Sequence, residues 1–255
     1  MPILIDPPVW PFRGRLFSHL ASDSSIDELH EFAARVGLHP RSYDGDHYDV
    51  PDTRYAEVVA AGAREVTNRE LLAAVSAAGL RFRKRRGERP LASLPDALPF
   101  LGPDPHRFEL LASPWLPPET TTFAAVAFVT DVRGHILLVH SPSRSGWEAP
   151  GGWRERAETA ADTAVRELRE ETGVVLDADA MTPVGYERIR FQVPPADPRL
   201  HPTCHVAVLA GRVDAPGADG MGPEGRPVVW ADTAEARRRC DAAPWWPLLE
   251  RVLDG

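Results

Sequence analysis

The sequence predicts an α/β protein made of two domains. Its 255 residues, at about 150 residues per domain, leave room for two compact units. Short apolar runs that suit buried strands alternate with segments whose apolar residues recur at helical spacing, which is typical of α/β folds. Charge and proline content divide the chain further: we expect a small α/β domain over 1–80, a basic, proline-rich linker over 81–117 and a second domain over 118–255.

The first domain is expected to alternate short strands with helices. Ile3-Leu4-Ile5 has the apolar run of a buried strand, and Glu65-Val66-Thr67 is a second candidate strand. Three helices are predicted, each ended by a glycine: one capped by Ser24 or Ser25 and running to Val36, one over 53–61, and one capped by Asn68 and running to Ala78.

The second domain contains more strands. Two of them, over 121–130 and 135–141, flank a turn at Asp131-Val132-Arg133-Gly134. A helix follows, and three further strands are expected over 183–192, 204–213 and 227–230. The chain then ends in two helical stretches, the last of which is predicted to begin at Pro244.

Composition excludes several classes of protein. A net charge of −8 argues against a general nucleic-acid binder, which needs positive charge to displace counterions. The longest apolar run has about seven residues, far fewer than the ~20 that span a bilayer, and the first residues lack the pattern of a signal peptide. Cys204 and Cys240 match no metal-binding spacing. We therefore expect reduced thiols in a cytoplasmic protein that avoids membranes.

Three glutamates gather on one predicted helix of the second domain. Thr159 with Asp162 forms a capping-box pattern, and Gly173 suits the end of the helix. Glu167, Glu170 and Glu171 then share one face, where their like charges repel. A hard divalent cation removes that penalty and prefers oxygen ligands. The pattern predicts a Mg²⁺ or Mn²⁺ site, and the alternative is an acidic helix face in contact with solvent.

The segment around this helix resembles a known family. From Gly152 the residues run Gly-Trp-Arg-Glu-Arg-Ala-Glu, then seven more, then Arg-Glu-Leu-Arg-Glu-Glu-Thr-Gly-Val. This run matches without a gap the signature box of the Nudix hydrolases, G-x5-E-x7-R-E-U-x-E-E-x-G-U, where U is aliphatic. The resemblance covers roughly 118–255 and implies an α/β/α sandwich with a mixed sheet. It also implies metal-dependent hydrolysis of a phosphoanhydride bond in a nucleoside-diphosphate-linked substrate.

The same resemblance implies roles for individual residues. The metal ligands would be four groups of the box: the Gly152 carbonyl, Glu167, Glu170 and Glu171. Glu158 and Arg166 would form a structural ion pair. The catalytic base would be Glu167 or Glu171, or a glutamate outside the box, for which Glu224 is the candidate.

Two further residues are candidates for substrate recognition. Arg144 could contact phosphate bidentately, and Trp153 could stack on a base; the alternatives are a surface arginine and a packed tryptophan. Nucleoside triphosphates, ADP-ribose and dinucleoside polyphosphates all fit the box. A Nudix-like protein that senses a nucleotide without cleaving it is the alternative function, but such domains usually lose box glutamates that this chain retains.

The first domain carries a separate set of polar residues. Metal-ligand types occur at six positions: Asp6, His19, Asp23, His30, His47 and Asp49. Residues 1–75 resemble a small bacterial family of uncharacterised domains with the same His-Tyr-Asp step, which implies no known activity. The domain is expected to position substrate, to join two chains in a homodimer, or to carry a second metal or active site. The alternative for these residues is polar side chains satisfied in turns and caps.

Overall fold

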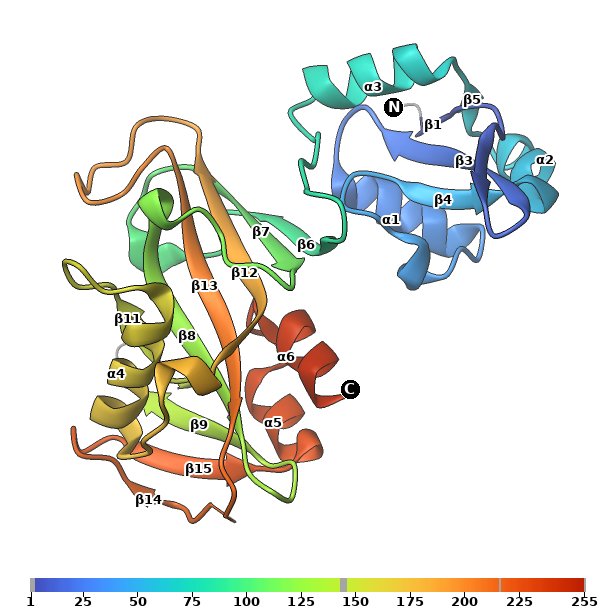
Figure 1. The fold of residues 1–255 in the computed structure, drawn as a ribbon. Coiled ribbons are helices and arrows are strands. Elements are labelled where there is room, and N and C mark those ends of the chain that lie inside the picture. The colour runs from blue at the N-terminus through green and yellow to red at the C-terminus, as the bar shows by residue number, and fades with distance from the viewer. Residues whose placement is uncertain (1–2, 143–145, 216, 255) are drawn as a thin grey trace. The chain divides into compact units, whose positions relative to one another are not determined.

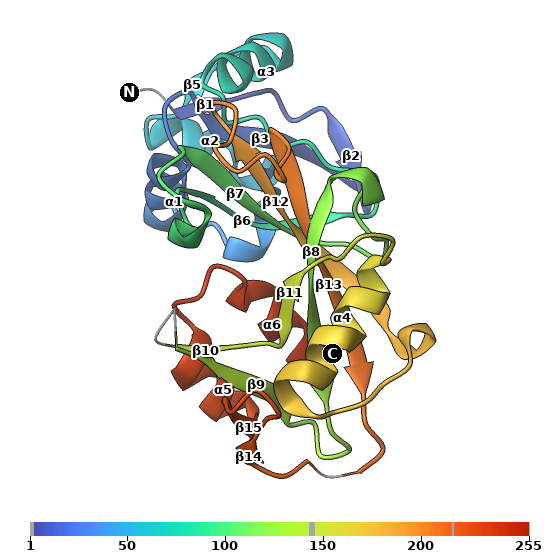
Figure 2. The same ribbon diagram turned by 90° about the vertical axis from the view of Figure 1, so that its left-hand side faces the viewer.

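The computed structural model describes residues 3–142, 146–215 and 217–254 and divides into two units, Met1–Pro90 and Leu91–Gly255 (Figures 1 and 2). Each unit has its own sheet and its own hydrophobic core. None of the helices among the described residues combines the length and the apolar character needed to cross a membrane.

The first unit is a small mixed sheet with three helices. Its strands are β1 (Ile3–Ile5), β2 (Trp10–Phe12), β3 (Arg15–Ser22), β4 (Tyr48–Pro51) and β5 (Arg64–Glu65), and its helices are α1 (Ile26–Arg35), α2 (Asp52–Ala60) and α3 (Asn68–Ala77), with the short 3-10 helix η1 at Pro40–Ser42. The strand order is β2-β3-β1-β5, and β4 pairs with β3. β1 is antiparallel to β3 and parallel to β5, so the predicted small α/β domain is observed.

Side-chain caps mark the starts of α1 and α3. The Ser25 side chain accepts a hydrogen bond from the Glu28 N–H at the start of α1, and Ile26, Leu29 and Phe32 are buried on the inner face of that helix. α3 is capped by Thr67, not by Asn68 as predicted, because the Thr67 hydroxyl and the Glu70 carboxylate form a reciprocal capping box.

The second unit is built on a ten-stranded mixed sheet. Its main path is β14-β15-β9-β8-β13-β12-β7-β6, with β10 on β9 and β11 on β8. The strands are β6 (Arg89–Pro95), β7 (His106–Ala112), β8 (Thr122–Thr130), β9 (Ile136–Ser141), β10 (Gly146–Glu148), β11 (Gly151–Trp153), β12 (Thr182–Phe191), β13 (Thr203–Arg212), β14 (Gly220–Met221) and β15 (Pro227–Ala231). β8 and β13 run parallel, and β13 pairs antiparallel with β12.

Helices cover both faces of this sheet. They are α4 (Ala160–Thr172), α5 (Thr233–Cys240) and α6 (Trp246–Leu253), and 3-10 turns lie at η2 (Pro99–Leu101), η3 (Glu119–Thr121) and η4 (Ala178–Ala180). Figure 1 shows α4 on one side of the sheet and α5 with α6 on the other. Ala164 and Leu168 of α4 pack in one core cluster, and Leu248 and Leu249 of α6 pack in the second. Successive residues of β8 pack in opposite clusters, Ala124 and Phe128 in one and Ala125 and Ala127 in the other, so the sheet has a core on each face, as predicted for the sandwich.

The structure differs from the sequence prediction at the proposed linker. Residues 81–117 contain β6 and β7, and β7 pairs along its whole length with β12. Phe108, Leu110 and Leu111 of β7 are fully buried, so an apolar strand lies within the proline-rich stretch. Pro90 and Pro95 are in β6 at the end of the sheet order, where a missing N–H does not interrupt a ladder. The last helix begins at Trp246, two residues after the predicted start.

Candidate active site

The helix that carries the three glutamates is fixed at both ends. At its start, the Thr159 hydroxyl accepts from the Asp162 N–H, and the Asp162 carboxylate accepts from the Thr159 N–H. At its end, Gly173 adopts the left-handed conformation with φ at 78° and donates its N–H to the Arg169 carbonyl. These caps, with the buried Ala164 and Leu168, fix which face of α4 carries Glu167, Glu170 and Glu171.

Strand β11 brings backbone directly against these carboxylates. The Gly151 N–H donates to Oε2 of Glu171 at 3.0 Å. A Cβ added to Gly152 would lie 2.3 Å from Oε1 of Glu167, so only glycine leaves that carboxylate its place. β11 is held in the sheet by antiparallel pairing of Gly152 with Ala125 of β8. The structure therefore places Gly152, Glu167 and Glu171 together.

Arg166 links the loop before α4 to the glutamates on the helix. Its Nε donates to Oε1 of Glu158 at 2.7 Å, and a terminal nitrogen donates to Glu167 at 2.8 Å and to Glu170 at 3.0 Å. The other terminal nitrogen donates to the Trp153 carbonyl at 2.9 Å. The Arg166 guanidinium holds the pKa of Glu158 at about 2, so Glu158 stays ionised and its ion pair connects the loop to α4.

A second arginine reaches the site from a distant loop. Arg226 forms an ion pair with Glu171, donates to Oε1 of Glu148 at 3.0 Å and donates to the His140 carbonyl at 2.9 Å. Sequence reasoning missed Arg226, because its main partner is 55 residues away in the chain. The available signal is its position two residues after Glu224, in the same glycine-rich loop.

The electrostatics of these carboxylates suit a cation. Burial raises the pKa of Glu171 to about 7, against the opposing effects of the Arg226 charge and the Gly151 N–H, and Glu167 and Glu148 raise it further. Burial also raises the pKa of Glu167, where Arg166 acts in the opposite direction and Glu170 and Glu224 add repulsion. Several oxygen donors thus crowd against one backbone strand, which is the donor chemistry that Mg²⁺ and Mn²⁺ prefer.

The remaining predicted site residues differ in their placement. Glu224 is exposed, and its charge acts on Glu167, so it is close enough to influence the glutamate cluster. Trp153 is partly buried: its ring meets Phe123 with centroids 4.9 Å apart, and the Arg199 guanidinium lies 4.0 Å from its ring centroid. Arg144 lies outside the described residues.

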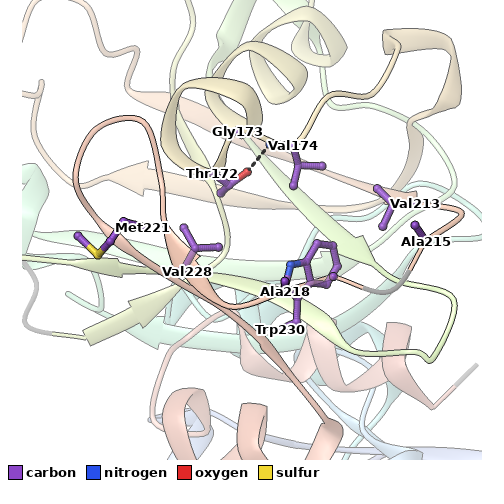
Figure 3. Close-up of a pocket in the computed structure, with 11 residues that line it drawn as sticks. Thr172, Gly173, Val174, Val213, Ala215, Ala218, Met221, Val228 and Trp230 are labelled. Carbon is purple, nitrogen blue, oxygen red and sulfur yellow. Dashed lines mark hydrogen bonds between the residues drawn. The ribbon is translucent and has the colours of Figure 1, made fainter.

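A cavity of the second unit lies at the end of α4 (Figure 3). It has a volume of about 310 Å³, and Thr172, Gly173, Val228 and Trp230 contribute to its wall. None of the predicted metal ligands lines it. Figure 3 shows mainly apolar side chains around this space, so its chemistry differs from that of the carboxylate cluster.

The first unit brings some of its predicted metal-ligand residues together. His19, His47 and Asp49 offer ligand atoms that all lie within 4.8 Å of one another. Asp6 forms a hydrogen bond with Nδ1 of His19. His30 is outside this group: its Nδ1 is 2.8 Å from the Tyr48 hydroxyl, and burial lowers its pKa. Asp23 is also outside it.

Comparison with known proteins gives two family matches. The NUDIX domain model matches residues 120–252, and the model described as "Protein of unknown function (DUF4031)" matches residues 3–78. A curated relative, the "Uncharacterized Nudix hydrolase YvcI" of Bacillus subtilis (strain 168), is 46% identical over 41 residues. That match spans 16% of this chain and only 26% of the relative's length.

Solved structures give weaker similarities. The pyrophosphohydrolase BsRppH of Bacillus subtilis has a TM-score of 0.42 at 17% identity, and the match covers 58% of this chain and 90% of that one. The dihydroneopterin triphosphate pyrophosphohydrolase of E. coli has a TM-score of 0.40 at 14% identity, with 53% and 97% covered. The Ap4A hydrolase of C. elegans has a TM-score of 0.36 at 17% identity, with 51% and 94% covered.

The family assignment follows from the first of these comparisons. The NUDIX model spans more than half of the chain and includes α4, β11 and the loop that carries Arg226. The carboxylate cluster described above therefore lies inside the matched region. The chain belongs to the Nudix family, and it carries a DUF4031 domain before its Nudix domain.

Proposed function

We propose that the second unit is a metal-dependent pyrophosphohydrolase that cleaves a phosphoanhydride bond in a nucleoside-diphosphate-linked substrate. One observation carries this proposal: the box glutamates of α4 meet the Gly151-Gly152 backbone of β11, with Glu167 against Gly152 and Glu171 on the Gly151 N–H. A solvent-exposed acidic helix face would not bury Glu171 to 5% exposure or require glycine opposite Glu167.

The residues divide into ligands and supports. Glu167, Glu170, Glu171 and the Gly152 carbonyl are the proposed holders of Mg²⁺ or Mn²⁺. When bound, the metal supplies charge neutralisation for the diphosphate and acidifies a water molecule. Arg166 and Glu158 connect the loop to the helix, and Arg226 forms ion pairs with Glu171 and Glu148.

The attacking water also needs a group that takes up its proton. Glu167 and Glu171 are candidates because burial raises both pKa values, which makes each a stronger base than an exposed glutamate. Glu224 is the third candidate, since it acts on Glu167 from the loop before β15 while remaining exposed to solvent. A base must lie within hydrogen-bond reach of the water, so kinetics of the three glutamine variants separate them.

Substrate contacts are proposed for two residues that are not among the metal ligands. Arg144 remains a candidate phosphate ligand. Trp153 remains a candidate for base stacking, and that role requires Arg199 to leave the ring face it covers. Nucleoside triphosphates, ADP-ribose and dinucleoside polyphosphates are the substrate classes to test.

The test is metal-dependent turnover across those substrates. With Mg²⁺ or Mn²⁺, we expect release of phosphate, pyrophosphate or mononucleotide from at least one of them. Hydrolysis in ¹⁸O-labelled water then shows which phosphorus is attacked. Glu171→Gln is expected to abolish turnover and to leave the circular dichroism spectrum intact, because it removes a proposed ligand without changing the side chain's volume.

The matched control is Glu155→Gln, which removes one charge from an exposed position of the loop before α4. It is expected to retain turnover. Full activity in folded Glu171→Gln would overturn the proposed site. Binding of a nucleotide by the wild-type chain without any turnover would instead favour the sensing alternative.

A further inference from the structure

The first unit contains a cavity of about 180 Å³ that the proposed function does not use. Its wall includes Trp10, His19, His47, Asn68 and Arg81, so two imidazoles, an amide and a guanidinium surround one space. Polar groups converging on a cavity are typical of a binding site. The chemistry of this cavity depends on how its two histidines are held.

Strand geometry explains why these residues meet. β3 and β4 pair antiparallel, and this register sets His19 directly opposite Asp49. Successive residues of a strand point to opposite faces, so His47 and Asp49 share a face, and Tyr48 between them is buried in the core. In the His-Tyr-Asp step, His47 and Asp49 therefore point to one face of the strand, and Tyr48 points to the other face and packs in the core.

A buried carboxylate fixes the orientation of His19. Asp6 is fully buried, and its Oδ2 lies 3.0 Å from Nδ1 of His19, 3.0 Å from Nε1 of Trp10 and 3.1 Å from Nδ2 of Asn68. A carboxylate accepts hydrogen bonds, so the imidazole proton lies on Nδ1 and the lone pair lies on Nε2.

His47 is held in the same way by a second buried carboxylate. Oδ1 of Asp46 lies 2.6 Å from Nδ1 of His47, and Oδ2 of Asp46 accepts from the Phe82 N–H at 2.7 Å and from Arg81 at 2.8 Å. Oδ1 of Asp49 lies 3.6 Å from Nε2 of His47, too far for a hydrogen bond. Burial lowers the pKa of His47, but its interactions with Asp46 and Asp49 raise that pKa to about 9. A metal ion that binds between Nε2 of His47 and Oδ1 of Asp49 therefore displaces the proton on Nε2.

We propose that His19, His47 and Asp49 bind a divalent transition-metal ion through Nε2, Nε2 and Oδ1. Imidazole nitrogens select Zn²⁺, Co²⁺, Ni²⁺ or Fe²⁺ over Mg²⁺. Metal-binding histidines usually donate their other ring nitrogen to a carboxylate, as His19 does to Asp6 and His47 to Asp46. Bond lengths of about 2.0–2.2 Å require only a small approach of ligand atoms that already lie within 4.8 Å of one another.

Three protein ligands leave coordination positions open on the side of the cavity. A structural zinc site closes its coordination with four protein groups, whereas a catalytic site keeps a position for water or substrate. Trp10 and Arg81 would flank that open side. The inference stands apart from the Nudix site, because its residues lie in the first unit and its donor set differs.

The experiment titrates the full-length chain with Zn²⁺ in excess Mg²⁺, which occupies an oxygen-donor site but competes poorly for imidazole. Calorimetry is expected to give one Zn²⁺ per chain. His19→Ala and His47→Gln are expected to weaken binding at least tenfold, and Asp6→Asn by roughly 10–100-fold through loss of its support to His19. His39→Ala, an exposed histidine of the same unit, is the matched control and should bind as the wild type does.

Two further measurements distinguish loss of metal binding from loss of the fold. Asp49 has a side chain that is 44% exposed, so Asp49→Asn should keep the fold and still lose Zn²⁺ affinity. Co²⁺ bound to the wild-type chain should give visible absorption bands that His47→Gln abolishes. Absence of Zn²⁺ binding in excess Mg²⁺, or equal binding by wild type and all three ligand variants, would overturn the proposal. In that case His47 would serve only to form ion pairs with Asp46 and Asp49.

Discussion

Gly152 is a position where one methyl group should disable the site. A Cβ there would overlap the carboxyl group of Glu167, the far end of a flexible side chain that can move away. Gly152→Ala should therefore cost little stability but displace a proposed ligand, and a 1 Å misplacement can cost about 10²-fold in rate. We expect metal-dependent turnover to fall at least tenfold. Gly220→Ala, where the added atom meets nothing within 4 Å, is the control and should turn over normally.

Arg226 is expected to matter for stability before any substrate binds. Its side chain is 15% exposed and neutralises Glu171 and Glu148, so Arg226→Met leaves two carboxylates close together. Removing one partner of a buried ion pair costs about 3–5 kcal/mol. We expect a loss near the lower end of that range in urea unfolding at pH 8 with EDTA. The loss should shrink at pH 5, where Glu171 takes up a proton.

The exposed Arg251→Met is the control for that charge change. Equal stability of Arg226→Met and Arg251→Met would contradict the role given to Arg226. Tryptophan fluorescence suits the measurement, because only Trp10 of the seven tryptophans lies in the first unit.

Arg166 and Arg226 differ in how far their partners could be predicted from the sequence. Arg166 and Glu158 are eight residues apart within one motif, and their pairing is predictable from the box. Arg226 and Glu171 are joined only by the fold, because β15 must pair with β9 before their loops can approach. No spacing rule connects them.

At the scale of one element, α4 depends on its first turn. Thr159→Ala removes the hydroxyl that accepts from the Asp162 N–H, and loss of such a cap typically costs ~1 kcal/mol. Thr159→Ser keeps the hydroxyl and should recover most of that stability. Chemical unfolding of the two variants and the wild type measures the difference, and equal losses in both would show that the cap is not responsible.

The loop before α4 should give the second unit a characteristic acid sensitivity. Arg166 holds the pKa of Glu158 at about 2, below its ordinary 4.5. Because the folded pKa is depressed, this contribution is complete above pH 4.5 and is lost as pH falls towards 2. Glu158→Gln should cost about 2 kcal/mol at pH 7 and progressively less below pH 4.5. Urea unfolding across this pH range is the measurement, and a pH-independent difference would contradict the pairing.

Among elements, those with a local signal were predictable. α4 begins and ends where its cap residues indicate, and β8 and β9 lie within one residue of their predicted bounds. β6 and β7 were obscured by the prolines around them, because proline content indicates a connector when pairing partners are unknown. The pairing of β3 with β4 brings together residues from separate segments, and it explains the proximity of His19 and Asp49.

For the whole molecule, the core clusters do not mix residues of the two units. Substitutions in separate cores with no shared partners usually act additively. We expect His19→Ala to leave Mg²⁺-dependent turnover unchanged and Glu171→Gln to leave Zn²⁺ binding unchanged. Turnover assays and calorimetry on both single variants and the double variant test this independence, and a non-additive double variant would show coupling.

The parallel pair of β8 and β13 has a consequence for how the second unit folds. Thr122 of β8 pairs with His205 of β13, so about eighty residues of chain separate the two strands. α4 lies between them in the sequence. Ladders between such distant segments close a long loop before they gain contacts, which slows folding. Refolding of the second unit should therefore take milliseconds to seconds, which stopped-flow fluorescence measures.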